Sequence, residues 1–250
     1  MSEATESAAV ASGAYRWAVY FSPPPQSPWA RAGAGWLGRD VDDGACEPAP
    51  RIAGWSAQTW SSVTGAPHRY GWHGTLRAPW RLASGCDSGD VLGVLRTLAA
   101  QTAPFDLPPL RLGYLNGFLA LQPVHPCAAL QALADACVKR LKPTAAPLTP
   151  AELERYGARG LSVRQQQYLH AWGYPYVLEE FQFHMTLTER LEALSAAQRA
   201  ELQAAAAARF DPLPQPLRVD ALSLFVQPQP AALLRRVARL PLGGDGATRA

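Results

Sequence analysis

Short runs in which apolar and polar residues alternate are the first feature of this chain. In residues 181–188 (FQFHMTLT) the alternation is almost unbroken, which is the period of a strand with one buried face. Residues 16–21 (RWAVYF) and 71–78 (GWHGTLRA) have strand composition, and each run is followed by proline or ends beside it. Asn116-Gly117 lies between two apolar runs and predicts a tight hairpin turn. Further strands are expected at 110–115, 117–121, 217–226 and 234–240.

Between these runs, apolar residues recur at helical spacing. The clearest case is residues 90–102, where valine and leucine return every three or four positions. Ser27 before Pro28, and Thr149 before Pro150, are typical of a helix start. The expected helices span 28–37, 90–102, 126–141, a segment that begins at 150, 162–172 and 195–209, and 40–56 is expected to be a loop.

The order of these elements predicts the fold class. Strands and helices fall into two groups with hairpins and without a regular strand–helix–strand repeat, which favours an α+β fold with antiparallel sheets. Each half of the chain carries one copy of a His-x-Thr-Leu pattern, so we expect a two-lobed pseudo-duplicate with a central cleft. We expect a disordered tail at 1–14, a single bilobal domain at 15–242 and a frayed C-terminus at 243–250.

Composition narrows the functional classes. The chain has 250 residues, 48% hydrophobic and 17% charged, which excludes a disordered polypeptide and supplies enough material for a core. The net charge is +3 without a run of Lys or Arg, so neither DNA nor a membrane surface is expected as a partner. The N-terminus has no signal-peptide pattern, and no stretch approaches the ~20 apolar residues of a membrane helix. We expect a cytoplasmic monomer with reduced cysteines at positions 46, 86, 127 and 137.

The repeated tetrapeptide is the strongest chemical signal. Two of the 5 histidines begin the pattern His-x-Thr-Leu, at residues 73–76 and 184–187. From residue frequencies, such a pair arises by chance on the order of once in a thousand sequences or less. Side chains at i and i+2 of a strand share a face, so each histidine shares a face with its threonine. The two predicted rows are His73, Thr75 and Arg77 in one copy and His184, Thr186 and Thr188 in the other.

Two imidazoles and two hydroxyls around one point suit the hydrolysis of a phosphodiester. Because free imidazole has a pKa near ~6.5, one histidine can accept a proton from water while the other donates one to the leaving oxygen. Thr75 and Thr186 can donate hydrogen bonds to the non-bridging oxygens, and Arg77 can add a charge-assisted contact. This chemistry requires neither a metal ion nor another cofactor, and none is expected.

With these motifs the chain resembles the 2H phosphoesterase superfamily, which includes RNA 2′,3′-cyclic phosphodiesterases and 2′-5′ RNA ligases. It is most similar to a branch encoded beside bacterial phosphonate-degradation genes, through stretches such as RYGWHGTLRAPWRLA and WGYPYVLEEFQFHMTLTERL. The resemblance implies a bilobal α+β fold, His73 and His184 as the acid–base pair, and Thr75 and Thr186 as phosphate contacts. That branch often has Lys where this chain has Arg77, which keeps the charge and changes its geometry.

A few other polar and aromatic residues lie near the motifs in the sequence or have side chains that could serve the same site. Tyr20 and Tyr176 are candidates for substrate binding, with packing as the alternative for both. Glu179 and Glu180 are adjacent in an extended run and would point to opposite faces, so we expect surface charges. The remaining histidines, at positions 68, 125 and 170, lack motif support and are expected to be structural or exposed.

Three functions follow, in order of preference. The first is a metal-independent phosphodiesterase acting on a small cyclic or linear sugar or nucleotide phosphodiester, with a place in phosphonate metabolism that the resemblance implies. The second is the processing of RNA ends that carry a 2′,3′-cyclic phosphate, which the absence of a basic patch disfavours. The third is a module that binds a nucleotide or sugar phosphate without turnover, which would not need two titrating groups.

Overall fold

The computed structural model describes residues 13–42, 44 and 52–243. Nine strands and seven α-helices are distinguished in this part of the chain, with 3₁₀ turns at Lys142–Thr144 and Leu178–Glu180. The strands are β1 (Arg16–Phe21), β2 (Gly74–Trp80), β3 (Phe105–Asp106), β4 (Leu110–Leu115), β5 (Phe118–Pro123), β6 (Met185–Arg190), β7 (Arg218–Val219), β8 (Ala221–Gln227) and β9 (Arg235–Pro241). The helices are α2 (Pro28–Leu37), α3 (Ala57–Tyr70), α4 (Ser88–Ala100), α5 (Ala128–Arg140), α6 (Pro150–Gly157), α7 (Val163–Trp172) and α8 (Ala196–Phe210).

One open sheet organises the molecule. Its seven strands pair antiparallel in the order β4-β5-β6-β2-β1-β8-β9, and β3 and β7 form a separate two-stranded sheet. The sheet is narrowest between β6 and β2, where a single residue pair joins a three-stranded half to a four-stranded half. The predicted α+β class with antiparallel strands is confirmed, and the two lobes are the two halves of this sheet.

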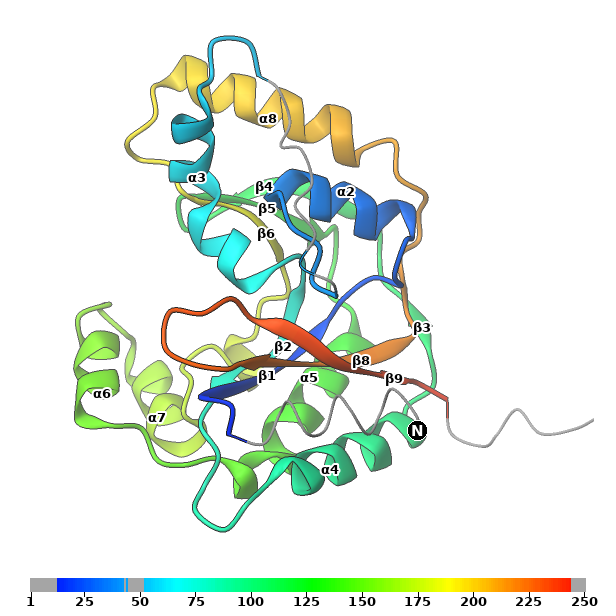
Figure 1. The fold of residues 1–250 in the computed structure, drawn as a ribbon, viewed down its shortest axis with the longest axis vertical. Coiled ribbons are helices and arrows are strands. Elements are labelled where there is room, and N and C mark those ends of the chain that lie inside the picture. The colour runs from blue at the N-terminus through cyan, green and yellow to red at the C-terminus, as the bar shows by residue number, and fades with distance from the viewer. Residues whose placement is uncertain (1–12, 43, 45–51, 244–250) are drawn as a thin grey trace, which may run out of the picture.

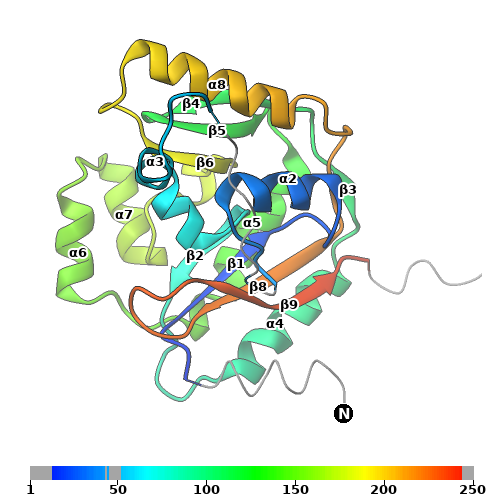
Figure 2. The same cartoon turned by 45° about the horizontal axis from the view of Figure 1, so that its top comes forward.

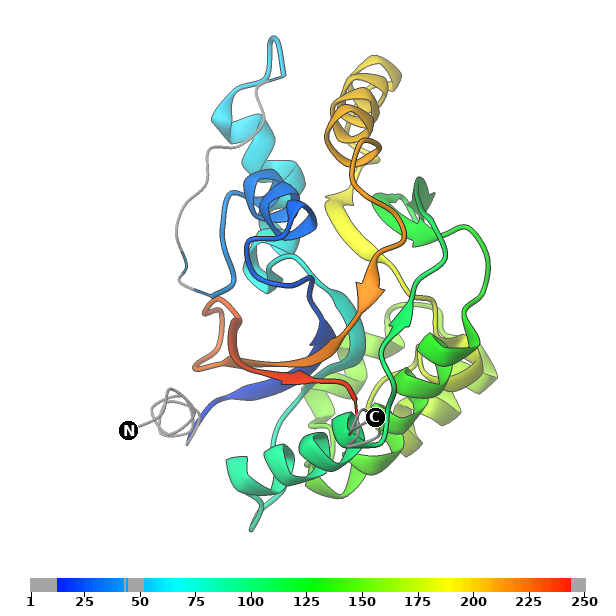
Figure 3. The ribbon, with the colours of Figure 1, turned by 90° about the vertical axis from the view of Figure 1, so that its right-hand side faces the viewer.

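The helices divide between the two halves (Figure 1). α3 packs on β6 and α8 lies against β4, whereas α5 packs on β2 and α4 lies under β8 and β9. Figure 3 shows α2, α3 and α8 at one end of the molecule and α4 and α5 at the other. α6 and α7 form a separate arm beside β2, which is seen from above in Figure 2. The three-stranded and four-stranded halves therefore each have their own helical cover.

Local sequence explains most helix and turn positions. Thr149 caps α6, Ser162 caps α7 and Ser195 caps α8, each in a capping box with the residue three positions later. The predicted hairpin turn joins β4 to β5, with positive φ at Asn116 (48°) and Gly117 (89°).

Several boundaries differ from the sequence expectations. The strand expected at 181–188 begins at Met185, and the strand expected at 71–78 begins at Gly74, so each motif histidine immediately precedes its strand. The strand expected at 217–226 is interrupted at Asp220 and becomes β7 and β8. Residues 1–12, 43, 45–51 and 244–250 lie outside the described part, so nearly all of the expected tail and frayed C-terminus, and residues 43 and 45–51 of the expected 40–56 loop, are not tested; the described residues of that loop carry no helix or strand.

α3 was not predicted at all. Its sequence, AQTWSSVTGAPHRY, is rich in weak helix formers and contains Pro67. The helix forms because Ser56 caps it and because Trp60 and Val63 bury one face against the β6 half of the sheet. None of the described helices is both long and apolar enough to cross a membrane.

Candidate active site

The two His-x-Thr-Leu copies meet at the narrow point of the sheet. β2 and β6 share one ladder pair, in which Gly74 lies opposite Met185. In an antiparallel pair the flanking residues also lie opposite each other, and their side chains point to the other face. Met185 is fully buried, so the flanking side chains point away from the core there. These flanking residues are His73, Thr75, His184 and Thr186.

Extended by one residue to each side of the Gly74–Met185 pair, this antiparallel register sets each histidine against the threonine of the other copy. Opposite side chains in a ladder have Cβ atoms roughly 5 Å apart, and diagonal neighbours lie about 7–8 Å apart, within reach of an imidazole. All four residues are partly exposed between buried neighbours, and the charge of His184 acts on His73. We call this set (His73, Thr75, His184 and Thr186) the histidine–threonine quartet.

Both imidazoles are held in the same way by the backbone. Nδ1 of His73 lies 2.8 Å from the carbonyl oxygen of Gly71, and Nδ1 of His184 lies 2.8 Å from the carbonyl oxygen of Gln182. A carbonyl only accepts, so Nδ1 carries the proton in both rings and Nε2 is left to exchange one. The Thr75 hydroxyl lies 3.3 Å from Nε2 of His73, which confirms that this pair shares a face.

Burial makes both rings resist protonation. The pKa of His73 is lowered to about 4, first by burial and then by the charges of His184 and Arg39, against the raising effect of the Gly71 carbonyl. Burial also lowers the pKa of His184, again against a backbone hydrogen bond. Both imidazoles are therefore neutral at pH 7 unless an anion lies between them.

Each imidazole also has an aromatic neighbour on the adjacent strand. The ring of Tyr20 on β1 stacks on His73, with centroids 3.7 Å apart and planes 21° apart. Phe118 on β5 is tilted against His184 at a centroid distance of 5.4 Å. Tyr20 is only 1% exposed and lies opposite Thr75 in the β1–β2 ladder, so its ring holds His73 in orientation.

A family model described as "Protein of unknown function (DUF1045)" matches residues 75–235. The chain belongs to the DUF1045 family. The matched range includes the whole second His-x-Thr-Leu copy and begins within the first, at Thr75.

Two curated relatives of this DUF1045 chain share the name "Ribose 1,5-bisphosphate phosphokinase PhnN". The protein from Laribacter hongkongensis (strain HLHK9) is 41% identical over 237 residues, covering 94% of this chain and 54% of the relative. The protein from Janthinobacterium sp. (strain Marseille) is 37% identical over 233 residues, covering 92% and 51%. The chain thus spans about half the length of the curated relatives it matches.

Solved structures with some similarity include E. coli LigT bound to 3′-AMP, with 14% identity, a TM-score of 0.42, and coverage of 91% of this chain and 98% of LigT. The structure of a phosphoesterase gives 13% identity and a TM-score of 0.40, with coverage of 92% of this chain and 99% of that protein. Likeness at this level is too low to support an inference about the DUF1045 chain.

Arg77 does not extend the row of His73 and Thr75, so that expectation is wrong. The β1–β2 ladder has a bulge at this point: Thr75 lies opposite Tyr20, but Arg77 lies opposite Val19. The extra residue turns Arg77 out of the row and under α5, where its Nη1 donates to the Val138 carbonyl at 2.7 Å. Arg77 is 4% exposed, and its guanidinium lies 4.4 Å from the Trp80 ring centroid.

Thr188 is likewise not on the row of His184. A bulge in the β5–β6 ladder leaves the Leu119 N–H without a strand partner, and the Thr188 hydroxyl accepts from it at 2.9 Å. The same hydroxyl donates to the Glu189 carbonyl at 2.8 Å, and the residue is 1% exposed. Thr188 therefore satisfies backbone groups at the bulge, and its burial disfavours contact with a substrate.

Tyr176 belongs to an aromatic cluster on the arm formed by α6 and α7. Its ring lies 5.5 Å from that of Tyr174, which lies 6.2 Å from that of Tyr156. Tyr174 acts electrostatically on Tyr20, which places this cluster beside the His73 side of the quartet. Arg159 lies over Tyr156 at 5.0 Å from the ring centroid. The sequence prediction included Tyr176 and did not find Tyr156 or Arg159.

Arg39 is a further residue that the sequence did not reveal. It is 2% exposed, and its guanidinium donates to the carbonyls of His68 (3.1 Å), Arg69 (3.3 Å) and Leu234 (3.0 Å). Burial lowers its pKa, and its charge reaches His73. It is a buried cation without motif context, so only the structure identifies it.

The remaining candidates occupy supporting positions. Glu179 and Glu180 accept hydrogen bonds from Tyr168 and Gln165 respectively, which agrees with the expected surface role. His68 binds the Leu37 carbonyl, whereas His125 and His170 are exposed. Cys86, Cys127 and Cys137 are free thiols, and Cys46 lies outside the described residues. Within the described ranges, no group of three or more His, Cys, Asp or Glu side chains is suited to a metal ion.

Proposed function

We propose that this DUF1045 chain is a phosphodiesterase in which His73 and His184 act as general acid and general base. The observation that carries the proposal is the register of β2 and β6, which brings two copies of one motif onto one face around Gly74 and Met185. Two imidazoles with the same Nδ1 anchor then present Nε2 to a shared space.

The reaction needs one proton acceptor and one proton donor. Nε2 of the neutral imidazole takes a proton from water as the water oxygen attacks phosphorus. Nε2 of the protonated imidazole gives its proton to the leaving oxygen as the P–O bond breaks. The products are a phosphomonoester and a free hydroxyl, and exchange with solvent restores the starting protonation states.

The electrostatics of the site support this assignment. Burial keeps both imidazoles neutral in the absence of an anion, and the negative charge of a phosphodiester favours protonation of one of them. The hydroxyls of Thr75 and Thr186 face the same space and can donate to the non-bridging oxygens in the transition state. The charge of Arg39 adds a longer-range attraction for the anion. The scheme uses no metal ion.

For the substrate we propose a small cyclic or linear phosphodiester of a sugar or nucleotide. The name of the two relatives refers to a ribose bisphosphate, and those proteins are about twice as long as the matched region. A phosphodiester of ribose is therefore the first compound to test, in keeping with the proposed place in phosphonate metabolism. RNA ends with a 2′,3′-cyclic phosphate are the competing substrate.

The decisive assay compares a ribose cyclic phosphate, a 2′,3′-cyclic mononucleotide and a short RNA with a 2′,3′-cyclic end. Each is incubated with the wild type, His73→Ala, His184→Ala and the double variant, with and without a chelator. His125→Ala is the matched control, because His125 is exposed and its ring nitrogen hydrogen-bonds to the carbonyl of its neighbour Pro126.

We expect hydrolysis that survives the chelator and falls at least ~100-fold in either single variant, the scale for a lost general acid or base. The control should retain full activity. Tight binding without product would instead indicate a binding module, and full activity in the double variant would exclude the proposed chemistry.

A further inference from the structure

A cavity of about 340 Å³ lies beside the quartet and shares none of its residues. Its lining residues come from the C-terminal part of β2, the end of α5, and the arm of α6 and α7. Figure 1 shows how these elements are arranged. Its volume is within the range of small-molecule sites. The lining side chains with polar or aromatic groups that matter here are Arg77, Trp80, Arg81, Lys142, Trp172 and Tyr174.

Two hydrogen-bond donors of this lining are buried without a partner. Nε of Arg77 and Nε1 of Trp80 have no acceptor, although the two residues are 4% and 8% exposed. Buried donors are normally satisfied, so two orphans on one cavity are informative. Both are adjacent in space, since the Arg77 guanidinium lies over the Trp80 ring. Because both residues line the cavity, a small movement of their side chains on ligand binding would offer these donors to an acceptor in it.

The charge around the cavity is unbalanced. Among the described residues, Arg77 has no carboxylate partner, and burial lowers its pKa to about 10, so it remains a cation at neutral pH. The nearby Cys137 thiol cannot neutralise it, because burial raises its pKa to about 12. The half-buried ammonium of Lys142 also lacks an acidic partner in the described part of the chain.

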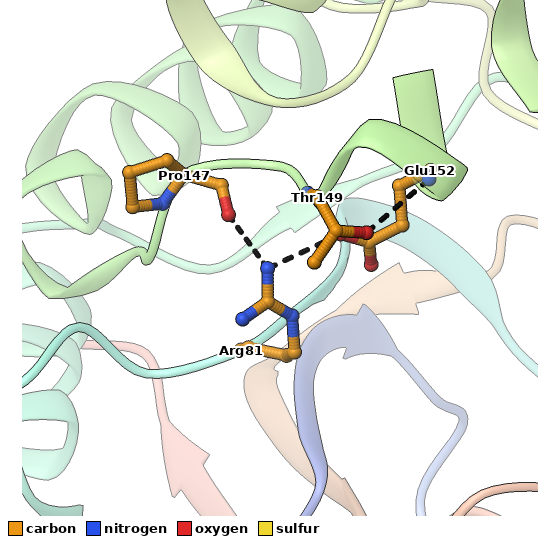
Figure 4. Close-up of polar contacts among 4 residues, drawn as sticks. All are labelled: Arg81, Pro147, Thr149 and Glu152. Carbon is orange, nitrogen blue, oxygen red and sulfur yellow. Dashed lines mark hydrogen bonds and ion pairs between the residues drawn. The ribbon is translucent and has the colours of Figure 1, made fainter. Parts of the chain in front are cut away.

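Arg81 and Glu152 have a different role, which Figure 4 shows. Nη2 of Arg81 donates to the Pro147 carbonyl at 2.6 Å and to Glu152 at 3.2 Å. Glu152 also completes the capping box of α6 with Thr149. These contacts hold the start of α6 against the end of β2. They also engage Glu152, the only acidic side chain among the lining residues. The charges of Arg77 and Lys142 therefore remain without a counterion.

We propose that this cavity binds the phosphate monoester group of a small metabolite. Arg77 and Lys142 supply charge-assisted hydrogen bonds, Trp80 donates its indole N–H, and the aromatic rings of Trp172 and Tyr174 cover the body of the ligand. The site is separate from the quartet, so it stands whether or not the proposed hydrolysis is correct. The ligand is either a separate phosphorylated compound or the distal phosphate of a substrate held by the quartet.

The test measures the affinity of the protein for ribose 5-phosphate, inorganic phosphate and neutral ribose by titration calorimetry. The NMR resonance of the Trp80 indole N–H is followed during the same titrations. The variants are Lys142→Ala and Trp80→Phe, and Arg77→Met is interpreted only if its thermal unfolding matches the wild type. Lys139→Ala is the matched control, because Lys139 lies in the last turn of α5, three residues before Lys142, pairs with Asp135 and does not line the cavity. The His73→Ala/His184→Ala double variant shows whether binding in the cavity depends on the quartet.

We expect ribose 5-phosphate to bind and to shift the Trp80 resonance, with affinity reduced about tenfold by Lys142→Ala and several-fold by Trp80→Phe. Unchanged binding in the double variant identifies a separate ligand, and weakened binding identifies a bridging substrate. Absence of binding, equal binding of ribose, or equal affinity in Lys142→Ala and Trp80→Phe would overturn the proposal.

Discussion

Phe183 packs its ring directly on the backbone of Gly74, so that a β-carbon on Gly74 would overlap the ring. Gly74 follows His73 and Phe183 precedes His184, so this contact joins the two motif strands next to both imidazoles. Close packing where β2 meets β6 therefore explains why the first motif copy has a glycine after its histidine.

Gly74→Ala is expected to displace Phe183 and, with it, His184. Overpacking of this kind destabilises by about 1–3 kcal/mol, and a shift of the imidazole by a fraction of an ångström lowers kcat by about tenfold or more. Chemical denaturation and turnover of a cyclic phosphate measure the two effects. Gly93→Ala on α4 is the control, because nothing lies within 4 Å of its β-carbon position. If Gly74→Ala and Gly93→Ala had the same stability and the same kcat, the contact between Phe183 and Gly74 would not be needed to position His184.

The stack of Tyr20 on His73 predicts a difference between two substitutions. Tyr20→Phe keeps the ring and should keep kcat within about threefold, whereas Tyr20→Leu removes the stack and should lower kcat about tenfold. The pH profile of kcat separates orientation from simple loss of fold, since a freed imidazole titrates closer to its ordinary pKa. Equal kcat and equal pH profiles in both variants would show that the stack does not orient His73.

The sequence predicts which side chains share a face of the strand within each motif, but it does not predict which face the residues after the motif occupy. The His-x-Thr-Leu repeat and its i, i+2 geometry suffice to predict that His73 and Thr75 lie together, as their 3.3 Å contact confirms. The prediction fails two residues further on, at Arg77 and Thr188. After the threonine, β2 has one extra residue relative to β1 and β6 has two relative to β5, and alternation alone carries no signal for such bulges.

The residues that the sequence missed act through tertiary contacts. α3 has weak intrinsic helix propensity, and its burial against β6 overrides that preference. Arg39 reaches the His73 region by binding carbonyls of residues 68, 69 and 234, which are distant in sequence. Such contacts depend on how the elements meet, which no local pattern encodes.

Substitutions of two threonines on β6 test the roles assigned to them, which are substrate contact for Thr186 and a structural hydrogen bond for Thr188. Thr186→Val removes a hydroxyl of the quartet and should lower kcat/KM about tenfold or more with little loss of stability. Thr188→Val leaves the Leu119 N–H without an acceptor and should destabilise by about 1–3 kcal/mol with little change in KM. Steady-state kinetics and urea denaturation on both variants are sufficient. The reverse pattern would assign substrate contact to Thr188.

The lowered pKa of His73 predicts an acid-sensitive fold. The folded-state pKa is about 4 against an ordinary value of 6.5, so between these values the unfolded chain binds more protons than the folded one. Stability therefore rises with pH across this window and falls as the pH drops from about 6.5 toward 4, by up to roughly 3 kcal/mol from this residue. His184 contributes in the same direction, because its pKa is also lowered.

His73→Asn removes this titration, so the difference in unfolding free energy between pH 7 and pH 4.5 should be smaller in the variant than in the wild type. Urea denaturation at both pH values measures the difference. His125→Asn is the matched control, since His125 is exposed, and it should keep the pH dependence of the wild type. Identical pH dependence in His73→Asn and the wild type would mean that His73 is protonated in the folded protein as readily as in the unfolded chain. Burial would then not hold the imidazole neutral, and the site would lack the base that the proposed reaction needs.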